Sequence, residues 1–377
     1  MKKIIFTGVA AMLLLTLLQL VSCSEGNSIG PSHYGYSPIA QGDTTGVLQW
    51  NGWLVDPNEV KDGGPGIDGI PALFEPEFVA ADAVGSYLHN NYLVLGLRVG
   101  DEMRAYPHAI LNWHEIINDT IGAKKIAVTY CPLTGSGIAL NRMANGQETT
   151  FRVSGLLYNS NLIPYDRLTR SYWSQMKMIS IAGEMVRTEF DFVPLIETTW
   201  GEWKKMYPET VVVSENTEIS RNYDRYPYGD YTSSAALIFP VSHLDNRLHR
   251  KSRVHGIIVN GSSLAFEIGA FPYDMDTINH EFAGASIITA GSSNRNIAVS
   301  YERTLNDGTV LDFNEYENDE FPSVIMTDLK TESKWDLTGL CIDGELKGMT
   351  LKPVLSFISY WFAWVVFYPD VELYSRF

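Results

Sequence analysis

Cysteine and positive charge are both scarce in this chain. Of its 377 residues only three are Cys, too few for a framework of several disulfides. Lys and Arg number 28 against 44 Asp and Glu, which gives a formal net charge of −16. A body this acidic repels the phosphates of nucleic acids, so we expect no nucleic-acid partner.

Long apolar runs are also few. They cover Ile4 to Leu20 near the N-terminus and Val354 to Tyr368 near the other end. As a helix rising 1.5 Å per residue, the second run would extend only about 22 Å, short of the roughly 30 Å hydrocarbon core of a bilayer. We therefore predict that it is a buried helix and not a membrane span.

The N-terminus has the order of a bacterial lipoprotein signal. Lys2 and Lys3 precede the first apolar run, and Leu20-Val21-Ser22-Cys23 follows it. Small residues directly before a Cys are typical of a lipobox. We predict a signal peptide over 1–22, and a lipidated Cys23 that opens a flexible tether over 23–43. The body would then lie in the cell envelope outside the cytoplasm, facing the periplasm or the cell surface, with the membrane as its partner through the lipid.

The remainder has the composition of a folded protein, and it contains an internal repeat. Hydrophobic residues make up 45% and charged residues 19% of the chain. Three patterns recur at offsets of 160 to 162 residues: Asp166-x-x-Thr169-x-Ser171-x-Trp173 with Asp328-x-x-Thr331-x-Ser333-x-Trp335, Trp200-x-x-Trp203 with Trp361-x-x-Trp364, and Val94-x-Gly96-Leu97-x-Val99 with Val254-x-Gly256-Ile257-x-Val259. Matched tryptophans at fixed spacing are hard to obtain by chance.

We therefore predict two degenerate copies of one unit of about 120 residues, related by pseudo-symmetry. The first copy covers 90–220 and the second 250–377, joined by a Tyr-rich connector over 221–249. An N-terminal extension over 44–89 precedes them.

The first copy reads as strand-rich α+β. Residues 93–99 alternate and are β-branched, which predicts a strand. Pro107 fits the first turn of a helix that would run to about Asp119. Residues 125–130 predict another strand, which ends at Cys131 before Pro132 and the turn over 135–137.

His114, Glu115 and Cys131 are the candidate site. His114 lies on the apolar face of the expected helix, Glu115 follows it, and Cys131 closes a strand at a turn. A thiol beside an imidazole is activated as a nucleophile, with Glu115 orienting His114. The same His114 and Cys131 are also ligands for copper or zinc, with Glu115 as a third. The third interpretation is a buried core His and an inert buried thiol, both of which are common in proteins.

The second copy lacks these polar groups. At an offset of 160, His114 corresponds to Asp274, Glu115 to Met275 and Cys131 to Gly291. Residues confined to one copy are candidates for a functional site, although sequence drift alone would give the same difference. We place the candidate site in the first copy.

A basic cluster closes the connector. Arg247, Arg250, Lys251 and Arg253 lie close to His243, His249 and His255. We predict that it lies on a surface loop of this otherwise acidic protein.

Several segments together resemble a bacterial family catalogued as domain of unknown function 3179. They are Ala105-Tyr106-Pro107, Asn112-Trp113-His114-Glu115, Thr129-Tyr130-Cys131-Pro132-Leu133-Thr134-Gly135, Tyr165-Asp166-Arg167, Tyr172-Trp173-Ser174-Gln175 and Trp361-Phe362-Ala363-Trp364. The resemblance extends from about residue 74 to 374 and implies no known activity. Many members of that family have a second Cys where Thr134 stands, so a dithiol or two-thiolate metal site is in doubt here.

Three classes of function stay open from the sequence. The protein is a thiol-dependent enzyme, a copper- or zinc-binding protein, or a non-catalytic ligand-binding or scaffold lipoprotein that uses the aromatic surface around Tyr223 and Tyr226. Its small-molecule or protein partner is not identified by any of these patterns.

Overall fold

The computed structural model describes residues 52–375 except 317 and 319. The expected signal peptide over 1–22, the lipidated Cys23 and the tether over 23–43 lie outside the described residues. Residues 44–51 of the expected N-terminal extension lie outside them as well.

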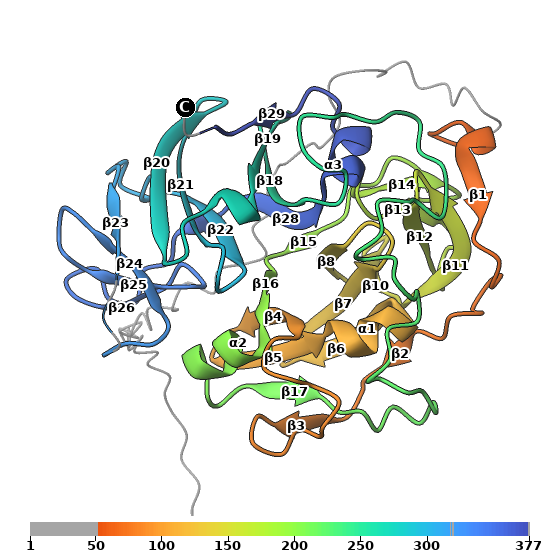
Figure 1. Cartoon of the computed structure of the whole chain (residues 1–377), viewed down its shortest axis with the longest axis horizontal. Coiled ribbons are helices and arrows are strands. Elements are labelled where there is room, and N and C mark those ends of the chain that lie inside the picture. The colour runs from red at the N-terminus through yellow and green to blue at the C-terminus, as the bar shows by residue number, and fades with distance from the viewer. Residues whose placement is uncertain (1–51, 317, 319, 376–377) are drawn as a thin grey trace, which may run out of the picture. The chain divides into compact units, whose positions relative to one another are not determined.

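Strands dominate the described part of the chain, which agrees with a strand-rich α+β class. The three α-helices have seven residues each: α1 (His108–His114), α2 (Trp200–Met206) and α3 (Trp361–Phe367). Figure 1 shows each of them directly after a strand.

The first half of the described chain, from β1 to β17, forms three main sheets. Their orders are β16-β4-β5-β17-β3, β15-β8-β7-β6-β2 and β1-β11-β12-β13-β14, with β9 and β10 as a separate hairpin. The strands are β1 (Val60–Asp62), β2 (Leu73–Phe74), β3 (Phe78–Ala80), β4 (Leu93–Val99), β5 (Glu102–Pro107), β6 (Ile116–Ile121), β7 (Lys124–Cys131), β8 (Ser136–Asn141), β9 (Met143–Ala144), β10 (Gln147–Glu148), β11 (Phe151–Tyr158), β12 (Asn161–Asp166), β13 (Tyr172–Ser174), β14 (Ile179–Ala182), β15 (Phe192–Val193), β16 (Ile196–Thr199) and β17 (Val211–Val213).

The second half of the described chain, from β18 onward, also forms three sheets. They are β28-β18-β19-β29, β27-β22-β21-β20 and β23-β24-β25-β26. The strands are β18 (Arg253–Val259), β19 (Ser262–Glu267), β20 (Asp276–Phe282), β21 (Ala285–Ser292), β22 (Ile297–Glu302), β23 (Phe313–Glu315), β24 (Val324–Asp328), β25 (Lys334–Asp336), β26 (Cys341–Asp343), β27 (Lys352–Pro353), β28 (Leu355–Tyr360) and β29 (Glu372–Leu373). A short 3₁₀ helix, η1 (Pro57–Glu59), precedes the first half, and another, η2 (Ile268–Ala270), follows β19.

Reciprocal contacts join the two halves. The backbone N–H of Tyr360 at the end of β28 donates to Thr134 O in the first half. In the opposite direction, the hydroxyl of Thr198 on β16 donates to Arg295 O in the second half, 2.8 Å away. Each half therefore places the end of one strand on the turn that follows a central strand of the other.

The recurring Asp-Thr-Ser-Trp pattern is a polar turn with an indole attached. Asp166 accepts hydrogen bonds from the N–H and hydroxyl of Thr169, from the N–H of Ser171, and from the indole N–H of Trp173 at 3.0 Å. Asp328 accepts the same set from Thr331, Ser333 and Trp335, again with the indole at 3.0 Å. One buried carboxylate thus ends a strand and fixes a core tryptophan in each half.

The recurring glycines make room for the helix tryptophans. A Cβ atom on Gly96 would lie 2.2 Å from the ring of Trp203, and one on Gly256 would lie 2.0 Å from the ring of Trp364. Both indoles are fully buried. Glycine at these two positions therefore lets α2 and α3 pack closely on their sheets.

The apolar run near the end of the chain is only partly helical. Its first part forms β28, and only Trp361–Phe367 form α3. Six of the seven residues of α3 are buried, against three of seven in α2. Among residues 52–375, with the two gaps noted above, no helix has the length and apolar character needed to cross a membrane.

The helix that we expected over 107–119 is shorter in the structure. It ends at His114, because Glu115 adopts a left-handed backbone with φ 56°. Residues 116–121 then form β6, which pairs with β7. Ile117, which falls within the expected helix, is therefore buried in a strand of the sheet. The local pattern of apolar residues suits both structures, and strand pairing decided between them.

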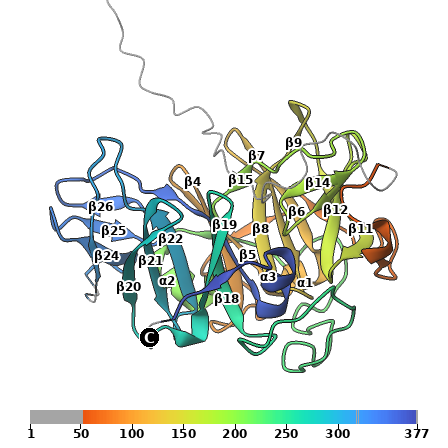
Figure 2. The same ribbon diagram turned by 90° about the horizontal axis from the view of Figure 1, so that it is seen from above.

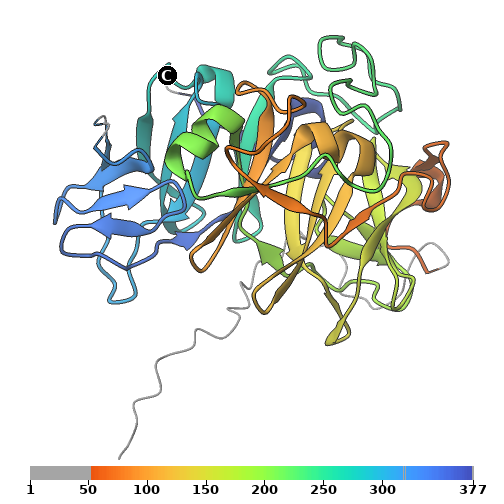
Figure 3. The same cartoon turned by 90° about the horizontal axis from the view of Figure 1, so that it is seen from below.

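The connector over residues 221–249, called the strap below, contains no helix or strand. Figure 1 shows it as a long irregular trace between β17 and β18. Figures 2 and 3 place the strap and the three helices toward one side of the sheets. Its attachments to the first half include the indole N–H of Trp113, which donates to Arg225 O, and the hydroxyl of Tyr231, which donates to Leu133 O. An irregular segment of this length inside a compact body is commonly functional.

The packing of Gly256 yields a test of the fold. The methyl group of Gly256→Ala would overlap the ring of Trp364. We therefore expect the free energy of unfolding to fall by roughly 1–3 kcal/mol. Urea denaturation followed by tryptophan fluorescence measures it. The control is Gly269→Ala, where an added Cβ meets no atom within 4 Å. Equal midpoints for the two variants would contradict the proposed packing.

Candidate functional site

Glu115 joins the end of α1 to the start of β6 in the candidate site. Its N–H donates to Leu111 O at 2.8 Å and closes α1, while its own carbonyl accepts from the N–H of Tyr130 at 2.7 Å. The left-handed conformation between these two bonds is unfavourable for a residue with a side chain. It turns the chain from helix to strand and sends the side chains of His114 and Glu115 in different directions.

His114 is fully buried and bonded on both ring nitrogens. Nδ1 lies 2.7 Å from Pro71 O, and Nε2 lies 2.7 Å from the hydroxyl of Tyr223. A carbonyl only accepts, so Nδ1 carries the proton and Nε2 accepts from Tyr223. Burial, with a smaller contribution from the charge of Arg221, lowers the pKa of His114 to about 4. The ring is therefore neutral at pH 7, and neither nitrogen faces Cys131.

Cys131 is the last residue of β7, at the base of a tight turn. Its carbonyl accepts from the N–H groups of Thr134 and Gly135, and its thiol lies 3.6 Å from Ser160 O. Burial, and after it the charge of Glu115, raises the pKa of the thiol to about 11. Cys131 is thus a neutral thiol at pH 7, and Glu115 lies close enough to affect it.

Glu115 is a buried carboxyl group that forms no ion pair with a basic side chain among residues 52–375, apart from the two gaps. Burial raises its pKa to about 7, although the hydroxyl of Tyr228, 3.4 Å from Oε1, opposes the shift. A carboxyl group with a pKa near neutrality exchanges its proton readily under ordinary conditions. Such a shift inside a buried polar cluster is a recognised mark of a functional group.

Tyrosine side chains gather around this pair. Burial raises the pKa of five hydroxyls, and the Cys131 thiol is near enough to add to each rise: Tyr130, Tyr226, Tyr228, Tyr231 and Tyr360. Three of these residues belong to the strap, one to β7 and one to β28 of the second half. Within the described part of the chain, the buried hydroxyl of Tyr226 has no hydrogen-bond partner.

Thr134 belongs to a neutral polar network below the turn. Its hydroxyl pairs with that of Ser136 at 2.8 Å and accepts from Asn161 at 3.0 Å. The amide of Gln175 bonds to both Ser136 and Thr129, at 2.8 and 2.9 Å. All five side chains are buried. The position where a second thiol would complete C-x-x-C is therefore used to hold the turn below Cys131.

The motifs of the Cys131 turn, the network and the helix end all fall within one family model, which matches residues 67–371. The chain belongs to the family described as protein of unknown function (DUF3179). No curated protein and no solved structure matches the chain.

The part of this DUF3179 chain that matches the family contains a second buried cluster, which the sequence analysis missed. His108 Nε2 lies 3.3 Å from Glu197 Oε2, and Glu197 also forms an ion pair with Arg253 from the second half. The ring of His108 lies 4.1 Å from that of Tyr130. Burial and the charge of Arg253 lower the pKa of His108. The sequence signal for this cluster was the acid Glu197, which lies in the largely buried strand Ile196–Thr199.

The basic cluster of the sequence analysis is divided by the structure. Arg247, His249 and Arg250 are at least partly exposed, as expected for a surface loop. Lys251 and His255 are buried, and Arg253 pairs with Glu197. The expectation was wrong for these three: β18 begins at Arg253 and carries Arg253 and His255 into the sheet, and Lys251 turns inward to donate to Tyr231 O and Ala236 O.

The expected copper or zinc ligands do not form a metal-binding set. Both nitrogens of His114 are bonded to Pro71 and Tyr223, which leaves Glu115 and the protonated Cys131. The described residues contain no group of three or more His, Cys, Asp or Glu side chains that would hold a metal ion. A tetrahedral site requires at least three such ligands from the protein.

The pKa of Glu115 predicts how stability depends on pH. The value is about 7 in the folded state and 4.5 ordinarily, so the folded state binds the proton more tightly. The stability that this group contributes is complete below pH 4.5 and is lost as pH rises through 7. Gln resembles the protonated acid, so Glu115→Gln should be more stable than the wild type at pH 8 by roughly 1–3 kcal/mol. Near pH 4.5 the two proteins should be equal.

Urea denaturation at both pH values measures the difference, with the exposed Glu209→Gln as the control. Groups such as His114, whose lowered pKa removes stability below pH 6.5, are common to both proteins and cancel. A variant that is less stable than the wild type at pH 8 would contradict the assignment.

Proposed function

We propose that this protein is a bacterial envelope lipoprotein whose first half binds a small molecule beside Glu115 and exchanges a proton with it. The observation that carries the proposal is the buried carboxyl of Glu115, whose pKa is about 7, in a tyrosine-rich cluster closed by the strap. In this cluster Glu115 is the acid–base group, and Cys131 is a neutral neighbour.

The choice of Glu115 over Cys131 follows from protonation at neutral pH. A thiol is nucleophilic as its thiolate, and a pKa of about 11 leaves little thiolate at pH 7. Acid–base catalysis works best when the pKa lies near the working pH, as that of Glu115 does. His114 would serve as a positioning residue, because its bonds to Pro71 and Tyr223 fix the end of α1 and with it the start of the strap.

The tyrosines indicate how a ligand would be held. The hydroxyl of Tyr226 is buried without a partner, and the bond from Tyr228 to Glu115 is long at 3.4 Å. The hydroxyls of Tyr226 and Tyr228 would each gain a hydrogen bond from a small polar molecule placed between the strap and α1. Since the strap holds both residues, its opening would admit the ligand.

The lipid anchor rests on the N-terminal sequence alone. The apolar run, the lipobox and Cys23 support acylation and an extracytoplasmic position. Metabolic labelling with a radioactive fatty acid tests it: the natural chain should take up label, and Cys23→Ala should not.

We also infer that the two halves are copies of one unit. The corresponding sheet orders and the two identical Asp-Thr-Ser-Trp turns support this. Strand ends then align Cys131 with Ser292, an offset of 161, and Glu115 with Asp276. This corrects the offset of 160 used above, under which Cys131 corresponded to Gly291. The second copy would keep a carboxyl group but carry a hydroxyl in place of the thiol.

Alkylation of Cys131 distinguishes the acid–base site from a thiol enzyme. In the Cys341→Ala chain, iodoacetamide should modify Cys131 at pH 7.5 at least tenfold more slowly than a free thiol such as glutathione. The rate should rise steeply above pH 9. Glu115→Gln removes the charge that helps to raise the thiol pKa, so alkylation at pH 9 should become faster. Peptide mass spectrometry over time measures both.

Rapid alkylation at pH 7.5 would overturn the proposal and restore Cys131 as a nucleophile. Glu202→Gln serves as the matched control for the loss of one acid. In the natural chain, the carboxylate of Glu202 pairs with Arg295.

A further inference from the structure

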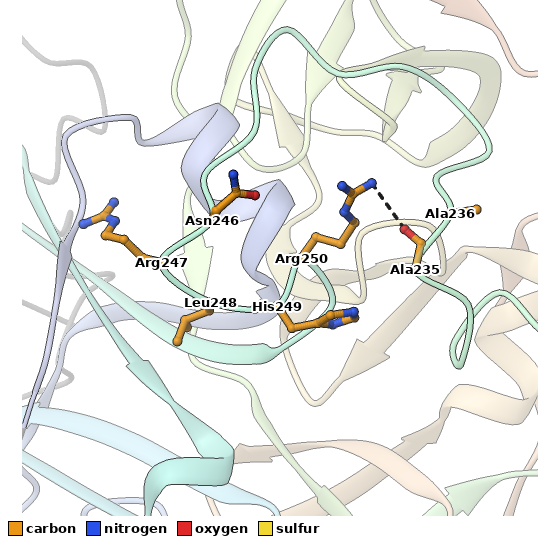
Figure 4. A pocket seen from close by; sticks show the side chains of 7 residues that line it. All are labelled: Ala235, Ala236, Asn246, Arg247, Leu248, His249 and Arg250. Atoms are coloured by element: carbon orange, nitrogen blue, oxygen red, sulfur yellow. Dashed lines mark hydrogen bonds between the residues drawn. The ribbon is translucent and has the colours of Figure 1, made fainter.

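The end of the strap contains an open hollow of about 660 Å³. It is lined by Ala235, Ala236 and the five residues from Asn246 to Arg250. Figure 4 shows Arg250 and His249 extending toward the Ala235–Ala236 end and Arg247 toward the opposite end. None of these residues belongs to the cluster around Glu115.

The charge of this segment is opposite to that of the protein. Residues 235–251 carry three Lys or Arg residues and one acid, Asp245, which gives a local charge of +2 in a chain of net charge −16; Arg253 is not counted because it pairs with Glu197. A concave surface of one sign concentrates ions of the other sign. The hollow is therefore suited to an anion.

Arg250 supplies hydrogen-bond donors that the protein leaves largely unused. Within the described part of the chain its guanidinium makes one long bond, to Ala235 O at 3.4 Å. A guanidinium carries five N–H donors in a planar fork that matches two oxygens of a phosphate. No acid pairs with Arg250 among the described residues, whereas Arg247 is paired with Asp245.

His249 presents a second donor in its neutral form. Its Nδ1 accepts from the backbone N–H of Lys251 at 3.3 Å, so the ring proton lies on Nε2. This places an N–H donor on the ring beside Arg250 without any need for a positive charge on the ring.

A buried lysine fixes the opposite wall. Lys251 bonds through Nζ to Tyr231 O and Ala236 O and lies 3.3 Å from the centre of the Tyr231 ring. Its ammonium group holds the backbone at Ala235 and Ala236 in place. At the far end, Arg247 donates to Val371 O at 3.0 Å and lies over the ring of Trp361. The hollow is thus held at both ends.

We propose that this hollow binds a phosphate group, with Arg250 and His249 as its direct donors and Arg247 and Lys251 as fixed positive charges. A phosphate monoester carries between one and two negative charges at neutral pH, which matches the local charge of +2 better than a single carboxylate does. Two sources offer this chemistry: a soluble phosphate ester, and the headgroup of an anionic phospholipid. The proposal does not depend on the role of Glu115.

Calorimetric titration of the full chain bearing Cys23→Ala with inorganic phosphate and with glycerol 3-phosphate tests the soluble source. Sedimentation with vesicles of phosphatidylglycerol and phosphatidylcholine, against phosphatidylcholine alone, tests the headgroup. Arg250→Gln should weaken binding at least tenfold, because it removes both the charge and the fork. Arg250→Lys keeps the charge and should weaken it less.

The matched control is Lys330→Gln, which removes an equal charge from an exposed position in the second half and should change binding less than twofold. His249→Gln, at another exposed position, gives a second measure if Arg250→Gln does not fold. Binding to vesicles alone would assign the headgroup, and binding to both soluble anions would assign a phosphate ester. The proposal is overturned if neither the soluble anions nor the phosphatidylglycerol vesicles bind. It is also overturned if Lys330→Gln weakens binding as much as Arg250→Gln.

Discussion

The left-handed backbone of Glu115 is the constraint on which the candidate site depends. It ends α1 after two turns, starts β6 and, through its carbonyl, holds the N–H of Tyr130 beside Cys131. It also separates two neighbouring side chains. His114 turns toward Pro71 and the strap, and Glu115 turns toward Tyr228 and the Cys131 turn. A right-handed residue here would continue the helix in place of starting β6.

Loss of water then decides the chemistry of each group. The same burial raises the pKa of Glu115 to about 7 and that of Cys131 to about 11. It makes the carboxyl group a proton carrier near neutral pH and keeps the thiol protonated. The low pKa of His114, about 4, has the same cause. The three groups singled out from the sequence therefore differ in what they are able to do, although all three are buried.

The site also needs parts of the chain that are far apart in sequence. Tyr360 arrives from the end of β28, and its N–H donates to Thr134 O in the turn after Cys131. Arg253 begins β18 and pairs with Glu197 of the first half. The strap adds Tyr226, Tyr228 and Tyr231 from above α1, and its far end forms the basic hollow. The second half and the strap thus complete a cluster whose central residues lie in the first half.

The family, the strand-rich class and the position of several elements could be predicted from the amino-acid pattern. Alternation located β4, and the turn residues after Cys131 marked the end of β7, since these features are local. The tertiary structure alone decided the end of α1, the partners of His114, and the grouping of Glu115 with tyrosines more than a hundred residues away. Those outcomes depend on strand pairing and on exclusion of water by distant segments, which no local pattern of residues encodes.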